Sequence, residues 1–383
     1  MRVWWDLDSA KFREWLRLCL IYSYEQPRDP PLMNHFKKNW VDQSVLKIEA
    51  DFCRSVDTHL IPIPLKKYAD HGIDLYLKDE STQPSGSLKH RLARSLFLYA
   101  LCNNWLNEDI TVIEASSGST AVSEAYFANM LNLPFIAVMP KSTSAEKIAR
   151  VKFYGGSCHL VDDDKEVYLV AKDLAKKIKG HFMDQFTYAE RATDWRGNNN
   201  IAQSIFSQMA LERHPIPKWI VVGAGTGGTS ATIGRYIRYQ KYPTQVCVPD
   251  PEGSVFLEFY QTGNQALTSK GSQIEGIGRP RPEASFIPSV IDHMIAVKNQ
   301  DSVASMQILS NMLSRKVGPS TGTNFFAMLK LANEMKKNQV KGSILSLLCD
   351  SGERYHNTFY NAKWILSNIG DVKSSMSTLK KFV

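Results

Sequence analysis

The 383-residue sequence contains no stretch that approaches roughly eighteen uncharged apolar residues, so it offers no candidate membrane-spanning helix. Its start, MRVWWDLDSAKFREWLRLCL, mixes acids and bases with the apolar side chains and lacks a small-residue cleavage site. A secretory signal needs an uncharged apolar segment followed by such a site, so we expect none. Both absences predict a cytoplasmic protein without a membrane partner.

The sequence also lacks long runs of one charge and closely spaced cysteine pairs. Lys and Arg total 46 against 38 Asp and Glu, but the basic residues are dispersed. This pattern is typical of solvated helix faces, so we expect no nucleic-acid partner, while the net charge of +8 suits an anionic cofactor or substrate. The six cysteines form no CxxC pair, which predicts reduced thiols in a cytosolic protein and no metal site.

The apolar content of 43% and charged content of 22% indicate a folded globular chain. From residue 70 onward, short apolar runs rich in β-branched residues alternate with helical patterns. The expected strands are 73–80, 110–116, 134–140, 157–163, 218–224, 244–250 and 343–350. This alternation predicts an α/β fold with mainly parallel sheets, covered by helices on both faces and therefore doubly wound.

We expect three parts along the chain. Residues 1–55 are a helical extension, and residues 56–190 and 191–383 are an N-terminal and a C-terminal α/β domain. The apolar stripe of the extension comprises Phe12, Trp15, Leu16, Cys19 and Leu20, after a possible cap at Ser9. Such a stripe is expected to pack on its own domain or on a partner subunit, with contact to a membrane surface as the alternative.

In an open parallel sheet, ligands bind beyond the carboxyl ends of the strands, so the loops there are the candidate sites. Strand 73–80 is followed by STQPSGSLKHR (81–91), where Lys89 stands in the first turn of a helix. The unsatisfied N–H groups of that turn disfavour a positive charge, which makes Lys89 a candidate amine nucleophile. An ordinary exposed lysine is the alternative.

Two further loops carry hydroxyls. After strand 110–116, the sequence SSGST places four hydroxyls and a glycine at a helix start, which predicts a site for a carboxylate, with simple capping as the alternative. This SSGST loop consists of Ser116, Ser117, Gly118, Ser119 and Thr120. After strand 343–350, Ser351 is placed either to bond a ligand or to cap a helix.

The loop after strand 218–224 is rich in glycine. This glycine run comprises Gly225, Thr226, Gly227, Gly228 and Thr229. Its backbone N–H groups can surround a phosphate. A side chain at Gly227 or Gly228 is expected to intrude on that phosphate, and a positive φ is a second expected reason for glycine there. The same segment fits GxGxxG, and Asp250 ends the next strand, so a nicotinamide dinucleotide is the alternative. Against it, the turn lies past the middle of the chain.

Together these motifs resemble the β-family of pyridoxal-phosphate enzymes, the group of cysteine synthase and cystathionine β-synthase, from about residue 60 to about residue 360. PSGSLK (84–89) is similar to the cofactor-lysine motif, which implies that Lys89 anchors pyridoxal 5'-phosphate and acts as the general base. The SSGST loop resembles the substrate-carboxylate loop, with Ser119 beside the cofactor, and the glycine run resembles the phosphate cradle.

The resemblance extends to three further segments. Segment 350–355 resembles the one whose serine, here Ser351, faces the pyridine nitrogen. Gln185 and Gly276 lie in segments similar to the family's substrate glutamine and active-site glycine turn.

Within this family, segments 114–128, 274–288 and 317–326 are most similar to the cysteine desulfhydrase branch. Ser119 stands where synthases carry an asparagine, and the stretch 188–200 replaces their Asn-Pro turn. The resemblance implies two doubly wound domains with the cofactor in the cleft between them, a homodimer, and an amino-acid substrate. The implied reaction is β-elimination on L-cysteine to sulfide, pyruvate and ammonia. Three alternatives stay open: β-replacement as in the synthases, an NAD-binding oxidoreductase, and a catalytically silent binding protein.

Overall fold

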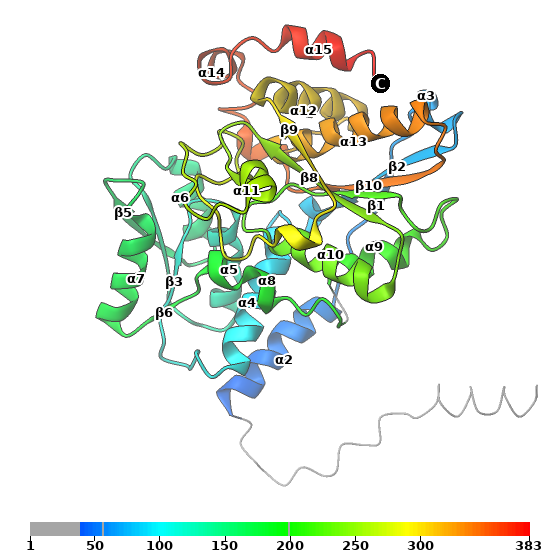
Figure 1. Cartoon of the computed structure of the whole chain (residues 1–383). Coiled ribbons are helices and arrows are strands. Elements are labelled where there is room, and N and C mark those ends of the chain that lie inside the picture. The colour runs from blue at the N-terminus through cyan, green and yellow to red at the C-terminus, as the bar shows by residue number, and fades with distance from the viewer. Residues whose placement is uncertain (1–38, 56, 198–199) are drawn as a thin grey trace, which may run out of the picture. The chain divides into compact units, whose positions relative to one another are not determined.

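The computed structural model describes residues 39–55, 57–197 and 200–383. The apolar stripe expected at residues 12–20 lies outside these ranges. Residues 40–383 form one compact unit that contains two β-sheets (Figure 1). Within the extension expected at 1–55, the structure describes the helix α2 (Trp40–Cys53).

The larger sheet has six strands in the order β1-β2-β10-β7-β8-β9, and all neighbours are parallel except β1 and β2. The strands are β1 (Leu60–Pro62), β2 (Ile73–Asp79), β7 (Trp219–Val221), β8 (Gln245–Pro251), β9 (His293–Val297) and β10 (Gly342–Leu348). All seven residues of β10 are buried, as expected of a central strand covered on both faces.

Helices cover both faces of the larger sheet (Figure 1). One face packs against α12 (Asn299–Leu313) and α13 (Pro319–Lys337), with Leu75, Phe325 and Ile344 in the core. The other packs against α9 (Ile201–Met209) and α10 (Gly228–Gln240), around Phe206 and Ile233. The remaining elements outside the smaller sheet are α3 (Lys66–Ala69), α11 (Phe256–Thr262), α14 (Ala362–Asn368), α15 (Lys373–Leu379) and the short helices η1 (Glu80–Thr82), η2 (Pro288–Val290) and η3 (Gly352–Tyr355).

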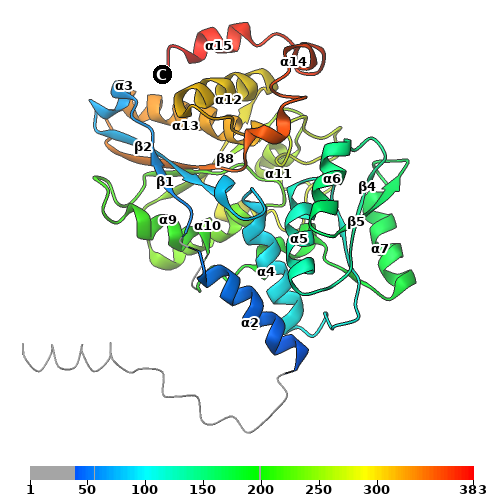
Figure 2. The same cartoon turned by 180° about the vertical axis from the view of Figure 1, so that it is seen from behind.

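The smaller sheet is fully parallel, in the order β5-β4-β3-β6. Its strands are β3 (Val112–Ala115), β4 (Phe135–Pro140), β5 (Ser157–Val161) and β6 (His181–Phe182). On one side, α2, α4 (Lys89–Cys102) and α5 (Ser119–Met130) lie together (Figure 2), with Ile48, Phe97 and Phe127 in their core. On the other side, α7 (Val167–Ile178) packs through Ala171 and Ala175. The remaining helices of this part are α6 (Ala145–Phe153) and α8 (Gln185–Ala192).

The carboxyl ends of β2, β10 and β7 lie at one edge of the larger sheet, because β10 pairs in parallel with β2 on one side and β7 on the other. The loops that carry Lys89, Ser351 and the glycine run therefore leave the sheet together. The backbone N–H of Leu88 donates to the Cys349 carbonyl oxygen at 2.8 Å, which joins two of these loops. The fold thus brings distant candidate motifs into one place.

The two mainly parallel sheets confirm the expected α/β fold, and each of the seven expected strands is present. Three strands were not expected, β1, β6 and β9, and all three lie at sheet edges. β1 has three residues and β6 has two, too few for a periodic pattern. The expected boundary at residue 190 does not separate the sheets, because β1 and β2 belong to the larger one. Pairing between β2 and β10 joins segments from the two ends of the chain, which no local pattern reveals.

Candidate active site

Lys89 is the first residue of α4, and its side chain is partly buried. Its Nζ lies 3.6 Å from the position that a Cβ on Gly225 would take. Burial lowers the pKa of Lys89 below its usual range and Arg279 adds to the lowering, whereas Cys349 and Asp350 oppose it. The lower pKa increases the share of the neutral amine, which is the form that acts as nucleophile or base.

Arg91, two residues after Lys89, holds the first turn of α4 in place. Its guanidinium pairs with Glu80 at 2.7 Å and with Asp57 at 2.6 Å. Glu80 is 0% exposed, and Lys78 Nζ lies 3.4 Å from the same Asp57 carboxylate. Removing one partner of such a buried pair costs about 3–5 kcal/mol, so this network fixes the start of α4 against the end of β2.

The glycine run meets the Lys89 amine at Gly225. A Cβ there would lie 2.3 Å from the Gly276 carbonyl oxygen, so only bare backbone fits. Gly276 itself has φ +89°, in the left-handed region that favours glycine. The structure thus brings together three of the residues singled out from the sequence.

Gly227 has the positive φ that was expected of this run, and both it and Gly228 are also required for a reason that was not expected, contact with neighbouring protein atoms. Gly227 has φ +91°, and a Cβ on it would lie 2.5 Å from the Cα of Phe286. A Cβ on Gly228 would lie 2.9 Å from the Cβ of Ala189. A side chain at Gly227 would therefore clash with the backbone of Phe286, and one at Gly228 with Ala189 of α8, whether or not a phosphate is bound.

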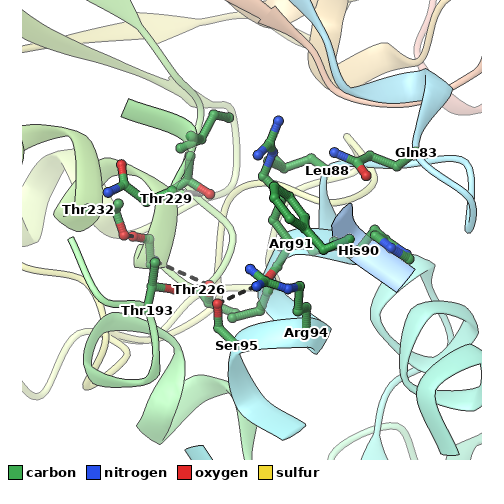
Figure 3. Close-up of a pocket in the computed structure, with 16 residues that line it drawn as sticks. Gln83, Leu88, His90, Arg91, Arg94, Ser95, Thr193, Thr226, Thr229 and Thr232 are labelled. Atoms are coloured by element: carbon green, nitrogen blue, oxygen red, sulfur yellow. Dashed lines mark hydrogen bonds between the residues drawn. The ribbon is translucent and has the colours of Figure 1, made fainter. Parts of the chain in front are cut away.

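A cavity of about 50 Å³ lies beside the glycine run, between α4 and α10. Figure 3 shows Thr226 and Thr229 on the α10 side, facing Leu88 and Arg91 on the other. Lys89 and Gly228 also line it. Hydroxyls and bare backbone at the start of a 13-residue helix make this region suited to an oxyanion.

The SSGST loop joins β3 to α5. The Gly118 N–H donates to Ser116 Oγ at 3.2 Å, and Ser117 is partly buried in the same turn. Thr120 Oγ1 donates to Gln185 Oε1 at 2.7 Å, so two residues that were expected to contact substrate are bonded to each other. A Cβ on Gly118 would meet no atom within 4 Å, which leaves open space beside the loop.

Ser119 contacts an arginine to which the sequence gave no role. The Nη1 group of Arg354, in η3, donates to Ser119 Oγ, and its Nη2 group donates to the Gly86 carbonyl oxygen at 3.4 Å. The guanidinium therefore joins the SSGST loop to the loop before Lys89. Ser119 and Arg354 are 235 positions apart, so no local signal could have found this contact.

Ser351 caps η3, since its Oγ accepts from the Glu353 N–H at 3.4 Å. A second hydroxyl near the end of β10 was missed by the sequence analysis. Ser320, 4% exposed in the first turn of α13, lies beside Cys349, and the neighbouring Thr321 Oγ1 accepts from the Cys349 N–H at 3.0 Å. Burial raises the pKa of the Cys349 thiol to about 12, so it is neutral. A serine directly after Gly-Pro at a helix start was the available signal.

Two buried glutamates lie behind the SSGST loop. Glu114 on β3 accepts from the N–H groups of Gln185 at 3.1 Å and of Ala115 at 2.7 Å. Glu124 on α5 interacts with Glu114, and both are 0% exposed. Burial raises the pKa of Glu114 to about 7, and burial together with the Glu114 charge raises the pKa of Glu124 well above its usual range. At least one of the two therefore holds a proton at neutral pH.

Residues 56–350 match the family described as pyridoxal-phosphate dependent enzyme. The chain belongs to this family. It is 56% identical over 348 residues to an L-cysteine desulfhydrase of Mycobacterium tuberculosis, covering 90% of this chain and 95% of the relative. It is 30% identical over 307 residues to cysteine synthase B of Campylobacter jejuni, covering 77% and 93%. The solved structure of O-ureido-L-serine synthase has a TM-score of 0.69 at 24% identity, covering 84% and 96%, which supports the fold.

The residues of this pyridoxal-phosphate dependent enzyme fit its cofactor at two points. The glycine run leaves bare backbone at the start of α10, where N–H groups and the helix dipole favour a phosphate. Among the described residues, the Lys89 Nζ makes neither a hydrogen bond nor an ion pair, so it is free to react with the cofactor's aldehyde.

The dinucleotide alternative is wrong for a member of the pyridoxal-phosphate dependent enzymes. Asp250, which would bind a ribose in that reading, is 5% exposed. Its carboxylate accepts from the Leu257 N–H at 2.8 Å, and burial raises its pKa to about 6. The acid therefore holds the start of α11 and is not presented to a ligand.

Among the described residues, no group of three or more potential metal ligands is found. Within the same ranges, no helix is both long and apolar enough to cross a bilayer. The five cysteines that the structure describes are free thiols.

Proposed function

We propose that the protein is a pyridoxal-phosphate-dependent L-cysteine desulfhydrase. It removes the β-thiol of L-cysteine and, with water, gives sulfide, pyruvate and ammonia. The observation that carries the proposal is the 56% identity to the Mycobacterium tuberculosis L-cysteine desulfhydrase over 90% of the chain. The desolvated Lys89 amine beside the glycine run supports it.

In this proposal the cofactor is held by the glycine run, by Lys89 and by Ser119. The backbone of Gly225, Gly227 and Gly228 would hold the phosphate, and Thr226, Gly228 and Thr229 line the cavity there. Bound pyridoxal phosphate supplies an electron sink for the charge that develops at the substrate Cα. Because bare backbone approaches the phosphate here, donors are supplied without side-chain entropy loss.

Lys89 then has two tasks, to anchor the cofactor and to take the Cα proton. A general base works best when it is neutral near the operating pH. Burial of Lys89 favours its neutral form, and its Nζ lies beside Gly225, at the start of the proposed phosphate site. The electron pair of the broken Cα–H bond forms the Cα–Cβ double bond, and the C–S bond breaks so that sulfur leaves with its own electron pair and takes up a proton as sulfide.

The substrate carboxylate is bound by the SSGST loop in this proposal. The donors are the hydroxyls of Ser116, Ser117 and Ser119 and the backbone N–H groups at the start of α5, whereas the Gly118 N–H and the Thr120 hydroxyl are bonded within the protein and shape the loop. The Thr120–Gln185 hydrogen bond fixes the loop against α8, and the bare Gly276 turn leaves room for the substrate. A preorganised set of donors lowers the cost of desolvating a carboxylate.

The partner of the pyridine nitrogen has two candidates. The resemblance assigns Ser351, whose Oγ is half-exposed and caps η3. The buried Ser320 hydroxyl beside Cys349 favours Ser320 instead. Either serine is neutral, so neither keeps the ring protonated as a carboxylate would. The absorption spectra of Ser320→Ala and Ser351→Ala holoenzymes test the choice, because only the true partner should alter the cofactor band.

β-Replacement is the second candidate reaction, favoured by the 30% identity to cysteine synthase B of Campylobacter jejuni. The two reactions share their first steps and differ in whether the intermediate is held for a second substrate. The short Ser119 side chain favours a looser hold on the intermediate, and the 56% identity to the desulfhydrase favours elimination. We therefore place elimination first.

We also propose that the enzyme is a cytoplasmic homodimer with a small amino-acid substrate and no nucleic-acid or membrane partner. The family resemblance supports the dimer, and the dispersed basic residues support the absence of a nucleic-acid partner. Light scattering of the purified protein tests the dimer, which should have twice the chain mass of 43.3 kDa.

The activity is tested by incubating the purified holoenzyme with L-cysteine. Equal amounts of sulfide and pyruvate, together with a visible absorption band before substrate is added, support the proposal. A visible band without turnover would instead indicate a catalytically silent cofactor-binding protein. A protein with no visible band after reconstitution would contradict the cofactor assignment.

A further inference from the structure

Arg354 lies where three loops meet. It follows β10 in η3, it donates to Ser119 Oγ in the SSGST loop, and it donates to the Gly86 carbonyl oxygen, three residues before Lys89. Its side chain is 11% exposed. A nearly buried guanidinium that contacts both the substrate loop and the lysine loop calls for an explanation that the family assignment does not give.

Neutralising Asp350 does not account for Arg354. The nearest approach of the two groups, between Nη1 and Asp350 Oδ2, is 3.5 Å, longer than a charge-assisted hydrogen bond. The same Oδ2 already accepts from the Tyr355 hydroxyl at 2.7 Å. The closer partner of Arg354 is the uncharged Ser119 hydroxyl.

The direction of the Arg354–Ser119 hydrogen bond is fixed by chemistry. A guanidinium has five N–H donors and no acceptor, so the Ser119 oxygen must accept. The hydroxyl hydrogen of Ser119 is then left for another acceptor, and none is found among the described residues. Ser119 is also the first residue of the 12-residue α5, where the helix dipole favours a negative partner.

We propose that Arg354 is a positioning residue that makes Ser119 an obligate hydrogen-bond donor to an anionic oxygen of the bound ligand. That oxygen belongs either to the ring of pyridoxal phosphate or to the substrate carboxylate. The positive charge of Arg354 polarises the hydroxyl and strengthens its donation. This role rests on the proposed function. Through Arg354 the Ser119 hydroxyl becomes a fixed hydrogen-bond donor, as the NH₂ group of an amide side chain is without a partner.

A double-mutant cycle tests the coupling, using purified holoenzymes of wild type, Ser119→Ala, Arg354→Met and the double variant. If Arg354 acts through Ser119, Arg354→Met lowers kcat/KM for L-cysteine roughly 10-fold in the wild type, as expected for one charge-assisted hydrogen bond. In the Ser119→Ala background the same change has less than about a 2-fold effect. Additive losses in the cycle overturn the proposal.

The visible spectrum and the KM of Arg354→Met together identify the ligand oxygen. A change in the visible cofactor band of Arg354→Met before substrate is added assigns the ring oxygen, whereas an unchanged band with a raised KM assigns the substrate carboxylate. An unchanged band and an unchanged KM overturn the proposal. If Arg354→Met does not fold, Arg354→Lys replaces it in the cycle, because an ammonium keeps the charge but cannot donate to both loops with the guanidinium's geometry.

Rescue and control variants complete the design. Ser119→Asn carries its own N–H donor, so Arg354→Met should have little effect on the cofactor band or KM in that background. Arg150→Gln is the matched control, because Arg150 is a neighbouring exposed cation that is electrostatically coupled to Arg354. Equal effects of Arg150→Gln and Arg354→Met would show a general charge effect and overturn the proposal. If the wild-type protein neither binds pyridoxal phosphate nor consumes L-cysteine, that result contradicts the proposed function itself, and it is distinct from the outcomes that overturn the role of Arg354.

Discussion

At the scale of single residues, the chemistry depends on a neutral Lys89. Helix-start geometry alone gave a reason to disfavour its charge, and the structure adds burial as the first cause of the lowered pKa. Arg279 acts in the same direction, whereas Asp350 acts against it. The amine is thus made reactive by its surroundings and held at the glycine run by the Arg91 network.

Lys89→Ala should abolish turnover, because it removes both the anchor and the base. Loss of a positioned base costs about 10²–10⁴-fold in rate, so we expect a loss of at least about 10³-fold in sulfide release. The visible band should also change, since the cofactor is no longer attached. Lys141→Ala is the control, because Lys141 is an exposed lysine paired with Asp162. Full activity of Lys89→Ala would show that another residue is the base.

The Glu114–Glu124 pair predicts a pH dependence of stability. The folded-state pKa of Glu114 is about 7, above the value of about 4.3 for an unfolded glutamate. The folded protein therefore binds these protons more tightly than the unfolded chain does. The associated stability is fully present below about pH 4 and is lost as the pH rises through about 7.

Glu124→Gln removes one carboxyl from this pair without changing its shape. The variant should unfold at a higher temperature than wild type at about pH 8, and the difference should shrink at about pH 5. Thermal unfolding followed by circular dichroism measures both values. Glu166→Gln, at an exposed glutamate, is the control and should show no such pH-dependent gain. Lower stability of Glu124→Gln than of wild type at about pH 8 would show that the Glu124 carboxyl does not destabilise the folded protein at that pH.

At the scale of elements, the site is formed by loops at the carboxyl ends of parallel strands. The loops after β2, β7 and β10 leave one sheet edge together, and the SSGST loop reaches them from the smaller sheet through Arg354. The sequence could predict these loops because each follows a buried apolar strand and carries unusual residues. It could not predict the role of Arg354, because the contact with Ser119 joins segments 235 positions apart, whereas Ser320 was marked only by its position after Gly-Pro at a helix start. Edge strands as short as β1 and β6 left no pattern to read.

Gly225→Ala tests the glycine run at its closest approach to Lys89. The added Cβ would lie 2.3 Å from the Gly276 carbonyl oxygen, so the loop must move where cofactor and amine meet. We expect cofactor affinity to fall at least about 10-fold, measured as pyridoxal phosphate retained after dialysis. Gly263→Ala is the matched control, because Gly263 also has a positive φ of +70° but no atom within 4 Å of a Cβ. Wild-type retention by Gly225→Ala would contradict the cradle assignment.

At the scale of the whole molecule, two sheets with separate cores supply different parts of one site. The larger sheet presents Lys89 and the glycine run, and the smaller sheet presents the SSGST loop with Gln185. A replacement enzyme must keep its intermediate dry until a second substrate arrives. Ser119 is shorter than an asparagine, and the stretch 188–200 exposes Arg191, Asp194 and Arg196. The shorter side chain favours release of the intermediate to water, and therefore elimination.

The measurement that tests this account most directly compares the two reactions in one enzyme preparation. L-cysteine alone is supplied and sulfide and pyruvate are followed. O-acetylserine with sulfide is then supplied and cysteine is followed. We predict that sulfide and pyruvate form in equal amounts, and faster per active site than cysteine is made. Much faster cysteine synthesis would contradict the desulfhydrase assignment and make the protein a cysteine synthase.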